Sequence, residues 1–262
     1  MKTALITGST DGLGKGVAIE LARKNYRVLL HGRDPEKGMA LVNDIKILTG
    51  NKNMCYYNAD FSDLNAVKEL AREIIENEAS LDVLVNNAGL GIEDSKRLSH
   101  QGHEMLFQVN YLATYMMTRM LTGLLSNSYD GRIVNIASAG QEPLDFSDVM
   151  LDKAWSGYQA YCQSKLSQIA MTFELADELF VKGISINALH PASMMPTKIV
   201  SHSIDTLEMG IKSVVKLVDD EDLKSVTGKY FFKTVQAESH EWAYDKKSRV
   251  KLINLSYDLT GL

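Results

Sequence analysis

The sequence is poor in cysteine and proline. Among 262 residues it has two cysteines, Cys55 and Cys162, and four prolines. Two cysteines cannot build a disulfide scaffold, and such scarcity suits a reducing compartment. Four prolines beside 18 glycines exclude a collagen-like chain or a proline-rich disordered one. We therefore expect a folded cytoplasmic protein.

The sequence also lacks a long hydrophobic run and a surplus of positive charge. Its most apolar stretch, residues 111–125, contains Arg119 and is too short to cross a bilayer, and the first residues show no signal-peptide core. Lys and Arg number 28 against 33 Asp and Glu, a net charge of −5, which argues against a reader of nucleic-acid phosphates. The composition predicts neither a membrane nor a nucleic-acid partner. The acidic run 219–222 favours a solvated helix start.

Short apolar runs rich in β-branched residues alternate with helical patterns along the whole chain. The expected strands are residues 4–7, 27–31, 53–58, 83–86, 132–137, 184–190 and 228–232. Helical spacing follows in Leu13, Val17 and Leu21, and again over 66–75 and 166–180. This cadence predicts an α/β fold in which a doubly wound parallel sheet of about seven strands carries helices on both faces. No linker interrupts it, so one domain spans residues 1–262.

The first expected strand runs directly into a glycine-rich turn, which opens the first helix. Glycine permits positive φ and lets the backbone approach a pyrophosphate, while the helix N-terminus offers N–H groups to the anion. An ordinary strand–helix turn can also be glycine-rich, but the position inside the first βαβ unit favours a dinucleotide site. The residues expected to bind the cofactor here are Gly8, Ser9, Thr10, Asp11, Gly12, Leu13 and Gly14.

The end of the second strand indicates which dinucleotide is bound. NAD sites usually place an acidic residue about 20 positions after the glycines, to bind the ribose hydroxyls. Here Gly32 occupies that position and Arg33 follows, and a guanidinium can pair with a 2′-phosphate. The alternative is a solvated arginine at a strand end, and Asp11 is acidic where some NADP sites carry a base. We expect NADP(H) to be preferred over NAD(H), with Arg33 as a ligand.

Two further motifs are weak when taken singly. Residues 86–89, Asn-Asn-Ala-Gly, close the fourth strand and by themselves predict only a turn. Tyr161 and Lys165 lie four positions apart on one helix face. Chance alone would produce such a pair about once in a chain of this composition.

Together and in this order, the motifs resemble the short-chain dehydrogenase/reductase family over essentially the whole chain. The matching elements are the turn at 7–14, Asp60 after the third strand, residues 86–89, Asn110, Ser138 after a strand, and Tyr161 with Lys165. Within that family the chain is similar to the retinol-dehydrogenase-like branch, through residues 102–118, 138–161, the surroundings of Tyr161 and the segment 255–262. Membrane-bound members of the branch carry a hydrophobic anchor, and we see none here.

The resemblance implies a Rossmann-type fold and hydride transfer between NADP(H) and a carbonyl or alcohol substrate, expected to be a lipophilic aldehyde or ketone. Tyr161 would be the general acid, or the base in the oxidative direction. Lys165 would lower the pKa of Tyr161 and bind the nicotinamide ribose. Ser138 would stabilise the substrate oxygen, and Asn110 would support a proton relay through a water.

The family also implies the remaining cofactor contacts. They are Asp60, Phe61, Asn87, Ala88, Gly89, Tyr161, Lys165, Pro191 and Thr197. Two departures from the family pattern occur after the sixth strand, where Ala192 replaces a glycine and Thr197 sits one residue later than the commonest spacing. A segment around 192–225 is expected to cover the substrate. A homodimer or homotetramer is common in the family, and no metal site is expected.

A second hypothesis is a non-catalytic module that senses NAD(P) on the same fold, because a fold does not fix a function. Degenerate members would be expected to lose the tyrosine or the lysine. This chain keeps Asn110, Ser138, Tyr161 and Lys165 together, which favours the enzyme.

Overall fold

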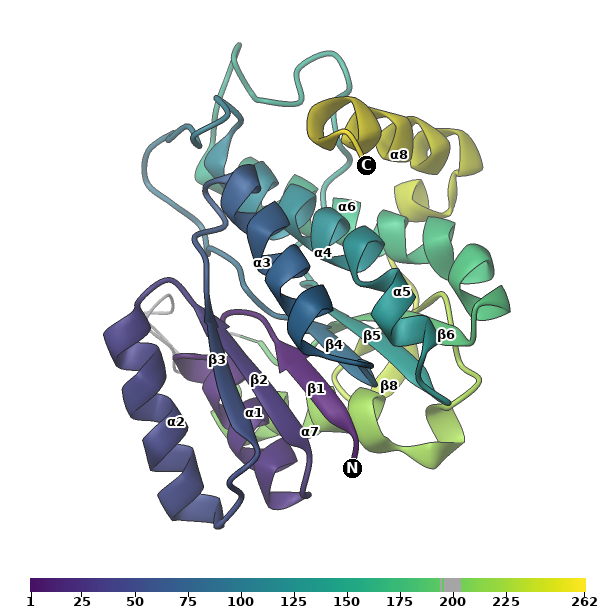
Figure 1. Cartoon of the computed structure of the whole chain (residues 1–262). Coiled ribbons are helices and arrows are strands. Elements are labelled where there is room, and N and C mark those ends of the chain that lie inside the picture. Colours follow the sequence, from purple (N-terminus) through teal and green to yellow (C-terminus); the bar gives the residue numbers. More distant parts are fainter. Residues whose placement is uncertain (194, 196–203) are drawn as a thin grey trace.

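The strands of the structure form one sheet in the order β3-β2-β1-β4-β5-β6-β7-β8 (Figure 1). This computed structural model describes residues 1–193, 195 and 204–262. The strands are β1 (Thr3–Ile6), β2 (Arg27–Gly32), β3 (Met54–Asn58), β4 (Val83–Asn86), β5 (Gly131–Ile136), β6 (Ile184–His190), β7 (Lys229–Phe232) and β8 (Val235–Ala237). All neighbours pair in parallel except β7 and β8. The doubly wound α/β prediction is confirmed, with β8 as an additional edge strand.

Helices cover both faces of the sheet because its strands are apolar on both sides. The helices are α1 (Gly12–Arg23), α2 (Pro35–Thr49), α3 (Leu64–Asn77), α4 (Ala113–Met120), α5 (Thr122–Ser126), α6 (Gly157–Val181), α7 (Leu207–Asp219) and α8 (Lys246–Thr260), with a π-helix η1 (Phe107–Leu112) and 3-10 turns η2 (Glu221–Leu223) and η3 (Glu241–Tyr244). Ala4 and Ile6 of β1 pack in one core with α1, α2 and α7. Leu5 packs in the other core, with α3, α4 and α6, as the two-residue period of a strand requires (Figure 1).

The expected helix that carries Tyr161 and Lys165 on one face is confirmed as α6, which extends before the apolar spacing at 166–180. It begins at Gly157, because the Ser156 hydroxyl accepts a hydrogen bond from the Gln159 amide and caps it. Tyr161 and Lys165 therefore both lie within the helix. Their common face is thus fixed by helical geometry rather than by a loop.

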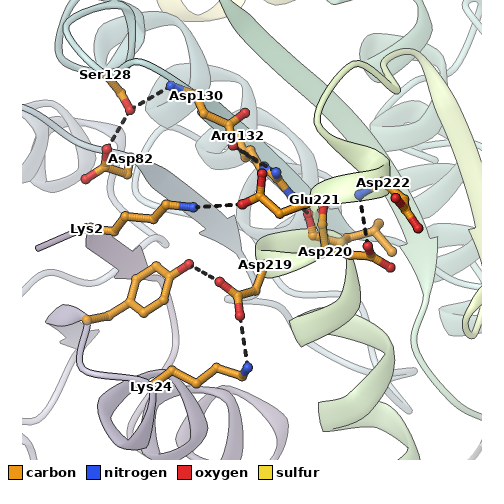
Figure 2. A network of polar contacts seen from close by, with 12 residues as sticks. Lys2, Lys24, Asp82, Ser128, Asp130, Arg132, Asp219, Asp220, Glu221 and Asp222 are labelled. Atoms are coloured by element: carbon orange, nitrogen blue, oxygen red, sulfur yellow. Dashed lines mark hydrogen bonds and ion pairs between the residues drawn. The ribbon is translucent and has the colours of Figure 1, made fainter.

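A polar network holds the other end of the sheet, where the parallel strands begin. Figure 2 shows Arg132, on β5 and only 2% exposed, between Asp130 and the chain that follows α7. Its guanidinium donates to the Asp130 carboxylate at 2.8 Å and to the Asp220 carbonyl at 2.8 Å. Arg132 therefore anchors the C-terminal end of α7 to the sheet.

The acidic run 219–222 begins a helical turn, as expected, in three of its four residues. Asp220 caps η2, and Glu221 and Asp222 lie exposed in its first turn. Asp219 instead ends α7 and accepts hydrogen bonds from Tyr26 at 2.6 Å and Lys24 at 2.9 Å (Figure 2). Tertiary pairing with the end of α1, which is remote in sequence, decides its role.

The described part of segment 192–225 consists of residues 192, 193, 195 and 204–225. Most of it is α7, which packs Val214, Leu217 and Val218 into the core that contains α1. Thr197 lies outside the described residues. No helix in the described ranges is both long enough and apolar enough to cross a membrane.

Candidate active site

The sequence-predicted site residues gather at the carboxyl edge of the sheet. The turn at 7–14 follows β1, Asp60 follows β3, Asn87 follows β4, and Ser138 follows β5. Strands β1 and β4 are neighbours, yet the chain crosses over to different faces after each of them. Ligands of open α/β sheets bind at such a reversal of strand order.

The glycine-rich turn has the geometry that close approach of a ligand backbone requires. Gly8 and Gly12 adopt φ values of 62° and 50°, in the left-handed region. A Cβ on Gly14 would lie 2.5 Å from the Gly8 carbonyl oxygen. The N-terminus of α1 is capped by Asp11, whose carboxylate accepts from the Gly12 amide at 2.9 Å, while the first turn itself contains no acidic side chain. The turn fits the pyrophosphate of a dinucleotide.

Asn87 ties this turn to the end of β4. Its Nδ2 donates to the carbonyls of Thr7 at 2.8 Å and Gly8 at 2.9 Å. The Thr7 hydroxyl accepts in turn from the amides of Asn87 and Ala88, both at 2.9 Å. The side-chain and backbone nitrogens of Asn87 therefore both hold the loop after β4 to the glycine-rich turn.

His31 also supports the turn, and sequence reasoning missed it. Its Nδ1 accepts from the Gly8 amide at 3.1 Å, and its Nε2 lies 3.2 Å from the Ala59 carbonyl, to which only a protonated Nε2 can donate. Burial lowers the pKa of His31 to about 4, against a smaller opposing effect of the Ala59 carbonyl. A single histidine within an apolar strand gives no sequence signal for such a role.

Three of the expected cofactor residues direct their side chains into the protein. The Phe61 ring stacks on His31 at 4.5 Å, and the Ser9 hydroxyl accepts from the His31 amide at 2.9 Å. Leu13 is buried in the core beneath α1. At these positions only the backbone can face a ligand.

The surroundings of Arg33 are open and basic. Arg33 is exposed directly after β2, and Lys37 in the first turn of α2 pairs with Asp11 at 3.3 Å. A Cβ on Gly32 would lie 2.6 Å from Thr10 Cγ2, so a larger residue there would crowd the turn. Asp60 is exposed, and its Oδ1 accepts from the Ser62 amide. Lys37 is a basic residue that the sequence analysis did not select.

Lys165 lies fully within the protein, beneath the end of β5. Its Nζ donates to the Ile136 carbonyl at 2.7 Å and to Gln168 Oε1 at 3.2 Å, and lies 5.9 Å from the centre of the Tyr161 ring. Burial lowers the pKa of Lys165 to about 7. A Cβ on Gly89 would lie 3.5 Å from this Nζ, so the lysine also reaches the loop after β4.

Tyr161 and Ser138 meet around Gly140. A Cβ on Gly140 would lie 3.6 Å from Ser138 Oγ and 3.8 Å from Tyr161 Cε1. Burial raises the pKa of Tyr161, and the Ser138 hydroxyl partly opposes that effect. Tyr161 is therefore a phenol at neutral pH, which is the form that donates a proton.

Backbone contacts fix the position of Ser138. Its carbonyl accepts from the Tyr230 hydroxyl at 3.0 Å, and the neighbouring Ala139 amide donates to His190 Nδ1 at 3.2 Å. Ser138 Oγ accepts from the Gly140 amide at 3.0 Å, and its hydroxyl also interacts with the Tyr161 phenol. Tyr230 and His190 come from other strands, and no sequence motif indicated them.

Asn110 joins the loop after β4 to α6. Its Oδ1 accepts from the Leu90 amide at 2.7 Å, and its Nδ2 donates to Ser164 Oγ at 3.0 Å. Asn110 lies in the π-helix η1, a conformation often found at functional sites. The structure thus brings Asn110, Ser138, Tyr161 and Lys165 into one region, whereas Pro191 lies buried at the end of β6.

A groove lined by described residues lies away from these four side chains. Its volume is about 850 Å³, and it runs between α1 and α7, with Asp11 and Gly12 at its lining. Ser138, Tyr161 and Lys165 do not line it. It touches the glycine-rich turn only from the side of α1.

Comparison with known sequences identifies the family. The model of the family described as short chain dehydrogenase matches residues 2–208. The chain belongs to this family. Retinol dehydrogenase 13 of Homo sapiens is 32% identical over 283 residues, which cover all of this chain and 85% of that protein. Retinol dehydrogenase 12 of Bos taurus is 30% identical, with all of this chain and 87% of that protein covered. These relatives confirm the retinol-dehydrogenase-like branch.

Solved structures agree with this assignment. An uncharacterized protein of Mycobacterium paratuberculosis superposes with a TM-score of 0.83 and 25% identity over all of this chain and 94% of its own. A short chain dehydrogenase of Shigella flexneri, complexed with NADP, gives a TM-score of 0.72 and 26% identity over 88% of this chain and 96% of its own. This short chain dehydrogenase is therefore an NAD(P)-dependent oxidoreductase that acts on alcohol or carbonyl groups of small molecules. The hypothesis of a non-catalytic module is set aside.

Proposed function

We propose that this short chain dehydrogenase interconverts lipophilic aldehydes or ketones and their alcohols, with NADP(H) as the preferred cofactor. The observation that carries the proposal is the meeting of Ser138 and Tyr161 around Gly140, one helical turn from the buried Lys165. When bound, the nicotinamide supplies or accepts the hydride. The chain itself must then manage one proton and one oxygen.

The four polar side chains divide this work. In reduction, the Tyr161 phenol donates its proton to the carbonyl oxygen, while the Ser138 hydroxyl stabilises the charge that develops on that oxygen. Lys165 binds the nicotinamide ribose and stabilises the phenolate left on Tyr161. Asn110 keeps the loop after β4 against α6 and supports the return of a proton to the pair.

Residues at the ends of the strands, from Lys165 to Arg33, would hold the cofactor. Backbone groups of the turn at 7–14 hold the pyrophosphate, and Asp60 with residues 87–89 surrounds the adenosine. Arg33 pairs with the 2′-phosphate, and Lys37 lies near enough to the turn, through Asp11, to add positive charge. The lack of an acidic side chain at Gly32 supports the preference for NADP(H).

The surroundings of Tyr161 support an apolar substrate. Tyr161, Leu90 and Trp155 pack against the buried cluster that contains Leu106 and Leu151. The relatives' names, retinol dehydrogenases, suggest a long hydrophobic alcohol or aldehyde as the first probe. We further propose that segment 192–225 covers this substrate. We also propose that the chain forms a homodimer or homotetramer, and light scattering can measure that oligomeric state.

Replacement of the proposed acid tests the reaction directly. Tyr161→Phe should lower kcat for all-trans-retinal at least about 100-fold, the lower end of what general acid catalysis contributes. NADPH affinity, measured by fluorescence titration, should stay unchanged. The matched control is Tyr158→Phe, because Tyr158 lies one turn earlier on α6 with its side chain exposed. Turnover by Tyr161→Phe at the rate of the control would refute the mechanism.

The cofactor preference is tested at Arg33. Arg33→Ala should weaken NADPH about 10-fold to 100-fold, the loss expected for charge-assisted hydrogen bonds to a phosphate, and should leave NADH almost unaffected. Arg72→Ala removes an exposed arginine on α3 and is the control. Equal weakening of NADPH and NADH by Arg33→Ala would show that Arg33 does not recognise the 2′-phosphate.

A further inference from the structure

The buried side-chain amide of Gln168 lies beside Lys165, and the proposed reaction gives it no role. Gln168 is fully buried and follows Lys165 by three residues, so both side chains lie on the same side of α6. Gln168 Oε1 accepts from Lys165 Nζ at 3.2 Å. A glutamine buried in a helix interior needs partners for both ends of its amide.

The other end of the amide is held by the π-helix. Gln168 Nε2 donates to the Asn110 carbonyl at 2.7 Å and lies 3.2 Å from Thr114 Oγ1. The Thr114 hydroxyl itself donates to the same carbonyl at 2.8 Å. A carbonyl only accepts and an ammonium only donates, so a flipped amide would oppose like groups at both ends. The orientation of Gln168 is thereby fixed.

This orientation matters because Lys165 has few acceptors. Its ammonium has three protons, and its hydrogen bonds within the described part of the chain are made to the Ile136 carbonyl and Gln168 Oε1. With two of its N–H groups held by these acceptors, the ammonium keeps one N–H for a further partner, and Tyr161 and Gly89 are both close to Nζ. Removal of either acceptor would leave a buried charge less well solvated and freer to turn.

We propose that Gln168 is a positioning residue of this active site, whose amide, locked by the Asn110 carbonyl and the Thr114 hydroxyl, aims the Lys165 ammonium at Tyr161. The inference rests on the proposed roles of Tyr161 and Lys165. It links η1 to the catalytic pair through a side chain rather than through the Asn110 amide alone. Because the hydrogen bond is made to the charged form of Lys165, its loss lowers the pKa of that lysine and weakens support for the Tyr161 phenolate.

The test is the pH profile of kcat for oxidation of all-trans-retinol with NADP⁺. Gln168→Met keeps the shape and removes the amide, so the acid limb should move to higher pH by about one unit, the effect of losing one hydrogen bond to a charged group. Gln168→Glu keeps an oxygen acceptor for Lys165 and adds negative charge, which raises the pKa of Lys165, but it loses the donor to the Asn110 carbonyl that locks the side chain, so kcat should fall. KM for retinol should stay unchanged in both variants.

The matched control is Gln163→Met, which removes another fully buried glutamine of α6 whose Nε2 donates to the Val149 carbonyl. It should lower Tm without moving the pH profile. A second readout, independent of turnover, is the pKa of Lys165 from the pH dependence of its ¹³Cε NMR signal, assigned by Lys165→Met. That pKa should fall in Gln168→Met and rise in Gln168→Glu.

Wild-type pH profiles and an unchanged Lys165 titration in both Gln168 variants would overturn this inference. If Gln168→Met does not fold, the direction of the shift in the pKa of Lys165 in Gln168→Glu decides the matter. The failure of the proposed function has a different signature, because Tyr161→Phe would then retain turnover. An inactive Tyr161→Phe together with unshifted Gln168 variants refutes the positioning role alone.

Discussion

Lowering the pH should destabilise the protein through His31, the residue behind the glycine-rich turn. Its Nδ1 must keep a lone pair for the Gly8 amide, and its Nε2 faces the Ala59 carbonyl. Burial holds the pKa of His31 at about 4, against an ordinary value of 6.5. As the pH falls, His31 is therefore protonated near pH 6.5 in the unfolded chain but only near pH 4 in the folded protein. Stability must fall as the pH falls through this window.

The magnitude follows from the two pKa values. At pH 5.5, one unit below the pKa of the unfolded histidine, the folded histidine is still neutral, so the free energy of unfolding falls by about 1 kcal/mol. Below pH 4 the loss approaches about 3 kcal/mol, because the pKa values differ by about 2.5 units. Protonation would also point a ring N–H at the Gly8 N–H, so the turn that binds the pyrophosphate would lose a support.

The assay is urea denaturation of wild type and His31→Asn at pH 8 and pH 5.5. Asparagine can accept from the Gly8 amide but does not titrate. His190, whose pKa burial also lowers to about 4, is present in both proteins and cancels in the comparison. The free energy of unfolding of the wild type should fall by about 1 kcal/mol more than that of the variant between the two pH values. The exposed His100, replaced by Asn, is the control and should not change the difference. Equal pH dependence of wild type and His31→Asn would refute the reasoning.

Two other substitutions probe the two ends of the sheet. Gly14→Ala would bring a Cβ within 2.5 Å of the Gly8 carbonyl oxygen, so the affinity for NADPH should fall by at least about tenfold. The control is Gly123→Ala, where a Cβ would meet nothing within 4 Å and the affinity should not change. Equal affinities of the two variants in fluorescence titration would contradict this prediction. Arg132→Met leaves the Asp130 carboxylate buried without its partner and should lower the free energy of unfolding by about 3–5 kcal/mol in urea. The double variant Arg132→Met with Asp130→Asn should recover part of the lost free energy of unfolding. If the double variant is as unstable as Arg132→Met alone, the unpaired Asp130 carboxylate is not the cause of the destabilisation.

The sheet could be predicted closely because its signal is local. Each of the seven expected strands is present, with its ends within one residue of the prediction. Buried parallel strands are apolar on both faces, which gives short continuous apolar runs, and their β-branched residues and their alternation with helical patterns favour strands. Strand β8 was missed because it is short and largely exposed, and because Lys233, with φ of 56°, makes the turn where a glycine or asparagine would have been a signal.

The candidate site was predictable only in part. Asn110, Ser138, Tyr161 and Lys165 stand out through their order along the chain, which a resemblance can recognise. The residues that hold these side chains in place do not stand out in the sequence, because a contact between α6 and η1 leaves no pattern at a fixed spacing along the chain. The side-chain directions of Ser9, Leu13 and Phe61 were equally invisible, because a motif specifies residue types and not which way each one faces.

The sequence by itself determined the α/β architecture, the glycine-rich turn at its first strand–helix junction and the set of reactive side chains. These depend on periodicity and on residue type, which are local properties of the chain. Only the tertiary structure decided how those side chains behave. Burial lowers the pKa of Lys165 to about 7 and raises the pKa of Tyr161, which keeps its phenol protonated. The partners that hold them, Gln168 for the lysine and His31 for the turn, come together only when helices and strands pack, because desolvation and hydrogen-bond partnership depend on distance in space rather than on distance along the chain.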